Sequence, residues 1–329
     1  MAKRKLTKQQ QVRISANQLT EPSSRSSEGD DAAVLQGLVI SHFGQQLEIE
    51  PLEGSLQNQT VRCFQRANLP RLVTGDKVLF QLDSQDTGVI LSAQPRNNVF
   101  ARPGFKGLIK PVAANIDKVL VVIAVLPEPF MNLTDRYLVA IESLNLDPII
   151  VLNKADLVNE KNRPHIDNMM SIYKGIGYDT HRVSASTGTG MAELESELAG
   201  LTTVLVGQSG VGKSSLVNSL SRQDSAAVGR LSIGKEKGTH TTTTARLFHL
   251  GTFDLVDSPG IREFNLGHIE PTLLIEGYRE LSALKGQCKF RDCAHQSEPA
   301  CAILAAVENG LVSRERLSNY FQILQSIGI

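Results

Sequence analysis

The spacing of hydrophobic and polar residues changes along this 329-residue chain, and each change predicts a different kind of structure. Residues 1–33 contain few apolar side chains and predict a disordered basic tail. Between residues 34 and 97, short alternating runs are separated by turn residues, which indicates strands at 34–41, 46–50, 60–65, 76–82 and 88–93. Short strands at this spacing are typical of a small Greek-key barrel such as an OB-fold.

Strand-like and helix-like segments alternate over most of residues 98–270. Residues 119–125 and 148–152 are continuous apolar runs, which suit strands buried on both faces. Residues 132–144 have helical spacing, with Asn132 as the expected N-cap, whereas residues 95–104 lack a clear period and suggest a linker. The alternation predicts an α/β domain with a parallel sheet, followed by a separate short helical domain at residues 271–329.

A glycine-rich loop lies between an apolar run at residues 203–206 and a helix-like segment at 215–220. Its G-x-x-x-x-G-K-S pattern predicts a P-loop, in which backbone N–H groups and the helix N-terminus bind a phosphate chain. Lys213 is expected to reach the outer phosphates, and the Ser214 hydroxyl to ligate Mg²⁺. The predicted nucleotide-binding residues here are Gly207, Gln208, Ser209, Gly210, Val211, Gly212, Lys213, Ser214 and Ser215.

A second motif, Asn153-Lys154-Ala155-Asp156, directly follows the apolar run at residues 148–152 and matches the N-K-x-D pattern that reads guanine in GTPases. Guanine presents two adjacent N–H donors, and one ionised Asp156 carboxylate can accept both. Lys154 can lie along the base, and Asn153 can brace neighbouring loops. About thirty residues later, Ser184-Ala185-Ser186 resembles the S-A-K loop that contacts guanine through backbone N–H groups, with serine in place of the usual lysine.

The remaining GTPase motifs follow the P-loop. Asp257-Ser258-Pro259-Gly260 matches D-x-x-G, in which Asp257 would hold a Mg²⁺-bound water and the Gly260 N–H would meet the γ-phosphate. Thr242, within a run of threonines, is the favoured switch residue for Mg²⁺. Because the guanine motifs precede the P-loop, the motif order is circularly permuted, which a domain with neighbouring termini can tolerate.

Four potential metal ligands lie near the C-terminus with the spacing C-x₄-C-x-H-x₅-C: Cys288, Cys293, His295 and Cys301. Three thiolates and one imidazole complete a tetrahedral zinc shell with no open position, as in structural sites. Such a site would supply much of the folding energy of so short a domain. Basic residues around it either face RNA or form solvated helix faces: Lys285, Lys289, Arg291, Arg314 and Arg316.

Composition sharpens this picture only modestly. The formal net charge is zero, so any basic surface for nucleic acid must be local, and the basic tail is either solvated or an arm for RNA phosphates. In the predicted barrel, Phe43, Phe64 and Phe80 are sparse and expected in the core, which favours a structural or backbone-binding role. With no apolar run of membrane-spanning length, we expect a cytoplasmic protein without membrane contacts.

Taken together, the predicted barrel, the permuted GTPase motifs and the Cys₃His segment resemble the ribosome small-subunit-dependent GTPase A family, also called RsgA/YjeQ. The resemblance runs from about residue 34 to the C-terminus and implies GTP/GDP, Mg²⁺ and one structural Zn²⁺ as cofactors. It further implies binding to the small ribosomal subunit and its rRNA late in maturation, with GTP hydrolysis coupled to release. We expect a monomer.

Catalysis requires a residue that orients the attacking water, and the position after D-x-x-G is Ile261, which has no hydrogen-bonding group. We therefore expect slow intrinsic turnover and hypothesise that His240, beside Thr242, orients water once the subunit binds, with Lys213 stabilising charge. Two alternatives remain: a P-loop ATPase, which Asp156 opposes, and a non-enzymatic GTP-sensing rRNA-binding scaffold. Stimulated turnover distinguishes the scaffold from the enzyme.

Overall fold

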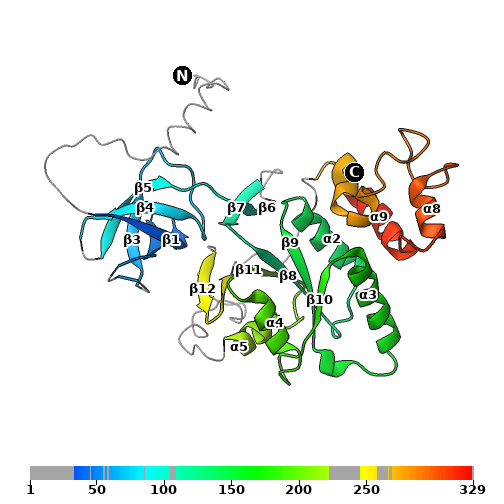
Figure 1. The fold of residues 1–329 in the computed structure, drawn as a ribbon, viewed down its shortest axis with the longest axis horizontal. Coiled ribbons are helices and arrows are strands. Elements are labelled where there is room, and N and C mark those ends of the chain that lie inside the picture. The colour runs from blue at the N-terminus through cyan, green and yellow to red at the C-terminus, as the bar shows by residue number, and fades with distance from the viewer. Residues whose placement is uncertain are drawn as a thin grey trace. The chain divides into compact units, whose positions relative to one another are not determined.

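The computed structural model describes residues 33–44, 46–54, 56–57, 59–84, 86–103, 109–221, 245–257, 266 and 269–327 (Figure 1). The predicted basic tail lies outside this range. The described chain divides into two compact units. The first holds the N-terminal part with residues 112–115 and 244–247, and the second holds 100–111, 116–243 and 248–329. The domain limits expected after residues 97 and 270 stay predictions.

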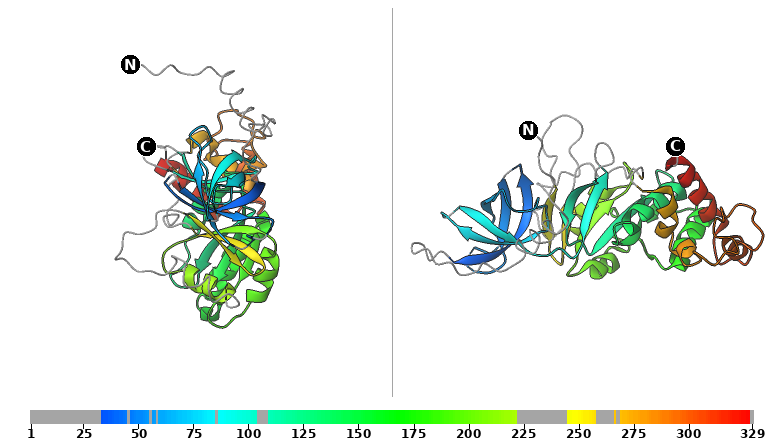
Figure 2. Two further views of the ribbon diagram at one scale, coloured as in Figure 1. Left: turned by 90° about the vertical axis from the view of Figure 1, so that its left-hand side faces the viewer. Right: turned by 90° about the horizontal axis from the view of Figure 1, so that it is seen from above.

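The first unit contains a closed five-stranded barrel (Figure 2). Its β1 pairs antiparallel with both β2 and β4, while β3 runs parallel to β5 and so closes the ring. This is the expected OB-type barrel, and every predicted strand is present within two residues of its predicted bounds. The strands are β1 (Val34–Phe43), β2 (Gln46–Pro51), β3 (Val61–Gln65), β4 (Lys77–Leu82) and β5 (Thr87–Ala93).

Alternation along these strands separates the barrel core from its surface. Phe80 and Cys63 are fully buried together with aliphatic side chains such as Ile49. Burial raises the pKa of the Cys63 thiol to about 12, as expected for a packing cysteine. The expectation that all three phenylalanines are core residues is wrong, because Phe43 is 49% and Phe64 is 44% exposed.

The second unit is built on a parallel sheet in the order β10–β9–β8–β11–β13, with β12 (Arg246–Leu250) beyond β13 (Figure 1). Its central strands are almost completely buried, as continuous apolar runs predict. The parallel strands are β8 (Lys118–Ala124), β9 (Asp147–Asn153), β10 (Asp179–Arg182), β11 (Thr202–Val206) and β13 (Phe253–Asp257).

Helices cover both faces of this sheet, as the alternation predicts. Leu120, Val122 and Ala124 share one face of β8 and pack with α4 (Met191–Leu198) and α5 (Lys213–Leu220). The intervening residues of β8 point to the opposite face, which α2 (Met131–Glu142) and α3 (Arg163–Ile176) cover (Figure 1). The α/β class of this region is therefore confirmed.

The described part of the C-terminal segment contains the helices η3 (Pro271–Gly277), α7 (Arg279–Ser282), α8 (Ala302–Glu308) and α9 (Arg314–Ile327). Of these, η3 and α9 pack onto α2. Gly277 permits the close approach of η3, because a Cβ there would lie 2.8 Å from a methyl of Val139 on α2. Asn132 does not cap α2 as expected; it lies inside the helix, where its amide donates to Gln322 of α9.

One connection differs from expectation. Residues 95–104 were predicted as a linker, but Val99–Pro103 forms β6, which pairs with β7 (Ile109–Ala114). Phe100 on β6 is fully buried. The short apolar run at this strand is too brief to show a period among its Pro and Asn neighbours. Among the described residues, no helix is long and apolar enough to cross a membrane.

Candidate nucleotide site and zinc site

The glycine-rich loop joins the end of β11 to the start of α5, which is the strand–loop–helix context of a P-loop. Gly207 and Gly212 adopt φ values of +143° and +90°, which side chains rarely permit. A Cβ on Gly207 would lie 2.2 Å from the carbonyl oxygen of Val122, and one on Gly212 would lie 2.5 Å from Nδ2 of Asn153. Glycine is required at both positions by conformation and by space.

Lys213 lies at the first turn of α5 and folds back over the loop. Its Nζ donates to the carbonyl oxygens of Gly207 at 2.6 Å and Gln208 at 2.8 Å. Ser214 follows on the same turn and is half-buried, while Ser215 is exposed. The lysine ammonium and the helix N-terminus therefore place positive charge at one end of the loop, as phosphate binding requires.

Asn153, at the carboxyl end of β9, joins three loops. Its buried amide donates from Nδ2 to the carbonyl oxygen of Val211 at 3.0 Å, and its Oδ1 accepts the N–H of Ala185 at 3.2 Å. Lys154 adopts a left-handed conformation with φ of 59°, and its Nζ donates to the carbonyl oxygens of Gly210 at 2.8 Å and Leu126 at 2.7 Å. These contacts bring the predicted guanine motif directly against the P-loop.

Asp156 is exposed, and one of its carboxylate oxygens is oriented by a neighbouring loop. The buried Ser184 hydroxyl donates to Asp156 Oδ1 at 2.5 Å and also accepts the N–H of Thr187 at 3.2 Å. The adjoining backbone is fixed by a hydrogen bond from the Ala155 N–H to the carbonyl oxygen of Val183. The Ser184–Ala185 loop thus supports the carboxylate that the sequence singles out.

The carboxyl ends of β8, β9, β11 and β13 meet at one edge of the sheet, because these strands are parallel. Asp257 is the last residue of β13 and so shares this edge with the P-loop and Asn153. Ligands of open α/β sheets bind at such an edge. The predicted His240, Thr242 and Gly260 lie outside the described residues.

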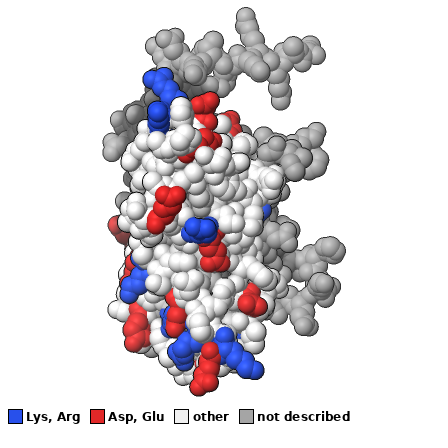
Figure 3. All heavy atoms as spheres, turned by 90° about the vertical axis from the view of Figure 1, so that its right-hand side faces the viewer, with Lys and Arg blue, Asp and Glu red and all other residues white. Residues whose placement is uncertain are grey.

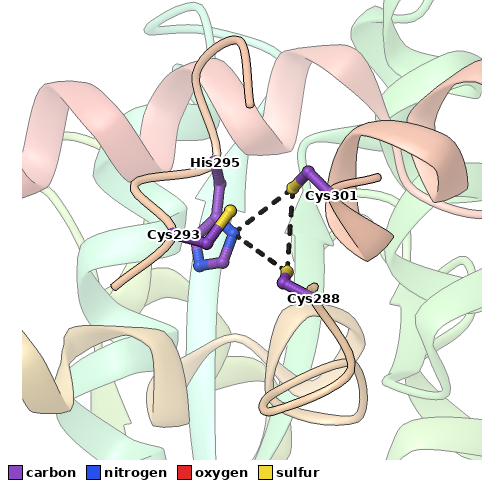
Figure 4. A group of neighbouring side chains, drawn as sticks. All are labelled: Cys288, Cys293, His295 and Cys301. Carbon is purple, nitrogen blue, oxygen red and sulfur yellow. Dashed lines mark hydrogen bonds between the residues drawn. The ribbon is translucent and has the colours of Figure 1, made fainter. Parts of the chain in front are cut away.

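The four C-terminal metal-ligand candidates converge, as Figure 4 shows. Their ligand atoms all lie within 4.8 Å of one another: Cys288, Cys293, His295 and Cys301. The Cys288 and Cys301 sulfurs are 3.8 Å apart, and His295 Nδ1 lies 3.5 Å and 3.4 Å from them. A tetrahedron with Zn–S bonds of about 2.3 Å has S···S edges of about 3.8 Å, so the cluster fits zinc.

Backbone N–H groups contact Cys288 and Glu298 in the segment that carries this cluster. The pKa of the Cys288 thiol lies below its usual value. Burial acts to raise this pKa, but hydrogen bonds from the N–H groups of Ala302 and Ile303 and from the neighbouring thiols lower it by more. Glu298 accepts backbone N–H groups of Ala294, Gln296 and Ser297, at 2.8 to 3.0 Å, and thereby closes the loop that carries His295. The backbone N–H of Glu298 itself contributes most to lowering the pKa of its carboxyl group. Together with the three N–H groups named above, it lowers this pKa to about 2.

Comparison with known proteins shows which family the chain belongs to. The sequence signature of the RsgA GTPase family matches residues 93–267, which is more than half of the chain. The chain belongs to the RsgA GTPase family. A relative from Azotobacter vinelandii, "Small ribosomal subunit biogenesis GTPase RsgA", is 48% identical over 99% of this chain and 98% of its own length. A Pseudomonas fluorescens relative of the same name is equally similar.

Two solved structures share the fold. YjeQ from Thermotoga maritima matches with a TM-score of 0.74 and 31% identity, covering 90% of this chain and 99% of its own. YloQ, described as a circularly permuted GTPase, matches with a TM-score of 0.72 at 24% identity, covering 92% of this chain and 98% of its own, which supports the fold alone. The protein is thus a GTP hydrolase with a permuted α/β domain.

Two features in and near these sites could not be predicted from the sequence. The carbonyl of Leu126 binds Lys154, but a backbone acceptor leaves no residue signature. Arg316, expected among the basic residues that either face RNA or are solvated, is fully buried. On the side of the molecule shown in Figure 3, basic and acidic side chains are interspersed, without a patch of one sign.

Proposed function

We propose that this RsgA-family enzyme binds the small ribosomal subunit and hydrolyses GTP to GDP and phosphate during late maturation of that subunit. The observation that carries the proposal is the joining of the guanine motif to the P-loop through Asn153 and Lys154, in a chain 48% identical to relatives named for small-subunit biogenesis. Hydrolysis is coupled to release from the subunit. The protein acts in the cytoplasm, as a monomer.

Each part of the nucleotide site has a distinct proposed role. The Asp156 carboxylate accepts the two N–H donors of guanine, while backbone N–H groups of the Ser184–Ala185–Ser186 loop contact the guanine oxygen. The P-loop from Gly207 to Ser215 holds the phosphates, and Lys213 stabilises charge on the outer ones. Magnesium is bound by Ser214 and Thr242, with Asp257 acting through a water and Gly260 meeting the γ-phosphate.

The isolated chain lacks the glutamine that usually orients the attacking water. Turnover is therefore slow until the subunit binds and stimulates it. Ile261 occupies that position, so intrinsic turnover is expected in the range of about 10⁻⁴–10⁻² s⁻¹ seen for unassisted GTPases. His240 is the proposed residue that orients water on the subunit. His240→Ala is expected to abolish subunit stimulation while GTP binding stays intact, and retention of full stimulation rejects this role.

Zinc holds the C-terminal segment in its folded form through Cys288, Cys293, His295 and Cys301. The closed ligand set leaves no position for a substrate, so the ion is structural and takes no part in hydrolysis.

The barrel provides a contact for rRNA. Phe43 on β1 lies opposite Gln46 on β2, which lies opposite Phe64 on β3, so the two exposed rings share one face of the sheet. Arg62, two residues before Phe64 and also exposed, adds positive charge to this face. Aromatic rings beside a basic residue suit stacking with unpaired bases in addition to phosphate contacts.

Phosphate release in the presence of mature small subunits tests the enzyme against its alternatives. Acceleration by subunits is expected, whereas its absence at saturating GTP favours a GTP-sensing scaffold. Competition between GTP and ATP tests base selection in the same preparation, and preferential binding of ATP contradicts the assignment of Asp156.

A further inference from the structure

A buried cluster of charged side chains joins the C-terminal segment to the α/β domain. Arg316 on α9 and Asp135 on α2 are both 0% exposed and form an ion pair through Nη1 of the arginine. Arg316 also makes a bidentate pair with Glu280 on α7, through Nε at 2.7 Å and Nη2 at 3.1 Å. One guanidinium therefore connects helices that are far apart in sequence.

Neighbouring side chains complete the shell around this cluster. Asp135 accepts the Tyr173 hydroxyl at 2.6 Å and the Asn319 amide at 2.8 Å, so both its oxygens are bound. The guanidinium of Arg316 lies 4.4 Å from the ring centroid of Tyr278 and 5.5 Å from that of Tyr173. Burying these charges costs several kcal/mol, and a hydrophobic substitute is often as stable, so stability alone is a weak reason for such a cluster.

A second contact holds the C-terminal end of α2. Arg279, next to Glu280, donates through Nε to Glu142 at 2.5 Å and lies 4.2 Å from the ring centroid of Tyr178. Two consecutive residues of α7 thus bind α9 and the last turn of α2. Along the chain, α7 follows the D-x-x-G motif.

The loop before the N-terminal end of α2 contacts the nucleotide site. Residues 125–130 join β8 to α2, and the carbonyl of Leu126 in this loop accepts Nζ of the guanine-motif lysine, Lys154. The same loop places Pro127 Cδ 3.7 Å from the position of a Cβ on Gly210 of the P-loop. The Tyr173 hydroxyl that binds Asp135 also lies 3.4 Å from the carbonyl oxygen of Met131, the first residue of α2.

We infer that Arg316 is a positioning residue that couples nucleotide binding to the zinc-binding segment through α2. Base and phosphate binding act on the loop before α2, and Arg316 ties the middle of α2 to α7 and α9. A segment attached this way moves with α2 when the nucleotide changes. The inference rests on the proposed GTP site but not on the ribosomal partner.

Hydrogen exchange at the backbone amides of α9 tests this coupling in the full zinc-loaded chain. Exchange is measured without nucleotide, with GDP and with a non-hydrolysable GTP analogue, together with the affinities for both nucleotides. The main variant is the neutral Asp135→Asn/Glu280→Gln/Arg316→Met, which leaves no unpaired buried charge. Arg314→Met, an exposed arginine on the same helix, is the matched control.

In the parent and the control, exchange in α9 is expected to differ between GDP and the GTP analogue. In the neutral variant this difference should disappear, and the ratio of the two affinities should shift by about fivefold or more, as is typical of coupled sites. Parental zinc content shows that the variant is folded. If it loses zinc, Arg316→Lys, which keeps the charge but not the bidentate pair, replaces it.

Either of two results overturns the inference: α9 exchange in the parent that is the same in every nucleotide state, or a folded variant that keeps the parental difference and affinity ratio. Failure of the proposed ribosomal function would give a different experimental result. A chain that shows nucleotide-dependent exchange but no acceleration by small subunits retains the coupling and loses the ribosomal role.

Discussion

The nucleotide site and the C-terminal segment lie in the same compact unit but are stabilised in different ways. The loops of the nucleotide site extend from a parallel sheet with a large apolar core, and their contacts are mainly hydrogen bonds to backbone atoms. The described part of the C-terminal segment has helices of 4 to 14 residues. It also holds a four-residue cluster that fits zinc, and it shares with α2 the buried charges of Arg316, Asp135 and Glu280.

This difference shows how each region acquires a defined geometry. A sheet supplies enough buried apolar surface to hold strained glycine loops in place without a ligand. The C-terminal segment buries fewer apolar side chains, such as Leu281, Ile303 and Ile323, and a bound metal is expected to add directional bonds to this packing. Loss of a single side chain should therefore affect folding less at the nucleotide site than in the C-terminal segment.

Removing a zinc ligand is expected to give the largest effect. Structural zinc sites in small domains supply about 10–16 kcal/mol of apparent binding free energy, so Cys301→Ser should release zinc and unfold α8 and α9. Zinc content and amide exchange in these helices measure the change, with Cys63→Ala in the barrel as a control that keeps zinc. Native exchange in α9 of a zinc-free chain would show that packing alone suffices.

Removing the carboxylate proposed to bind guanine should weaken GTP binding without unfolding. Asp156→Asn is expected to lose two charged hydrogen bonds to the base, each contributing about 1.5–3 kcal/mol, so GTP affinity should fall on the order of 10²–10⁴-fold. Titration with GTP and with ATP measures the change in selectivity. Asp167→Asn, which removes only a surface pair with Arg182, should keep the parental selectivity. Unchanged GTP affinity in Asp156→Asn contradicts the assignment.

Loss of the amide that joins the loops should have a moderate effect on both stability and binding. Asn153→Ala leaves the Ala185 N–H and the Val211 carbonyl without this partner in a buried site, at a cost of about 1–3 kcal/mol. A lower unfolding midpoint together with weaker GTP binding is expected. Asn218→Ala on the exposed side of α5 should change neither. If Asn153→Ala matches that control, the loops are held by other contacts.

The smallest effect is expected on removing the Tyr278 hydroxyl, with the Tyr173 hydroxyl as the comparison. The Tyr278 hydroxyl is buried and has no hydrogen-bond partner among the residues that the structure describes, whereas the Tyr173 hydroxyl donates to Asp135. Tyr278→Phe should therefore leave stability unchanged or raise it by up to about 1 kcal/mol, while Tyr173→Phe lowers it by about 1–3 kcal/mol. Thermal unfolding of both variants checks the sign. Equal destabilisation contradicts this distinction.

Residue types and spacing by themselves determined the chemistry of this protein. Glycines at fixed positions, the sequence from Asn153 to Asp156 and the four metal-ligand candidates predict phosphate, guanine and metal binding, because each site takes its main groups from one short segment. Period-two and apolar patterns likewise predicted the barrel and the parallel sheet. Local motifs and periodicity are properties of neighbouring residues, so they can be read along the chain.

Only the tertiary structure decided which side chains are buried where distant segments meet. Arg316 binds Glu280 and Asp135, which are 36 and 181 residues away, and Phe43 and Phe64 are exposed although their residue type favours a core. The carbonyl of Leu126 became a partner of Lys154 only through folding of the loop. Burial and pairing of this kind depend on three-dimensional contacts that no local pattern encodes, because the partners are brought together by packing.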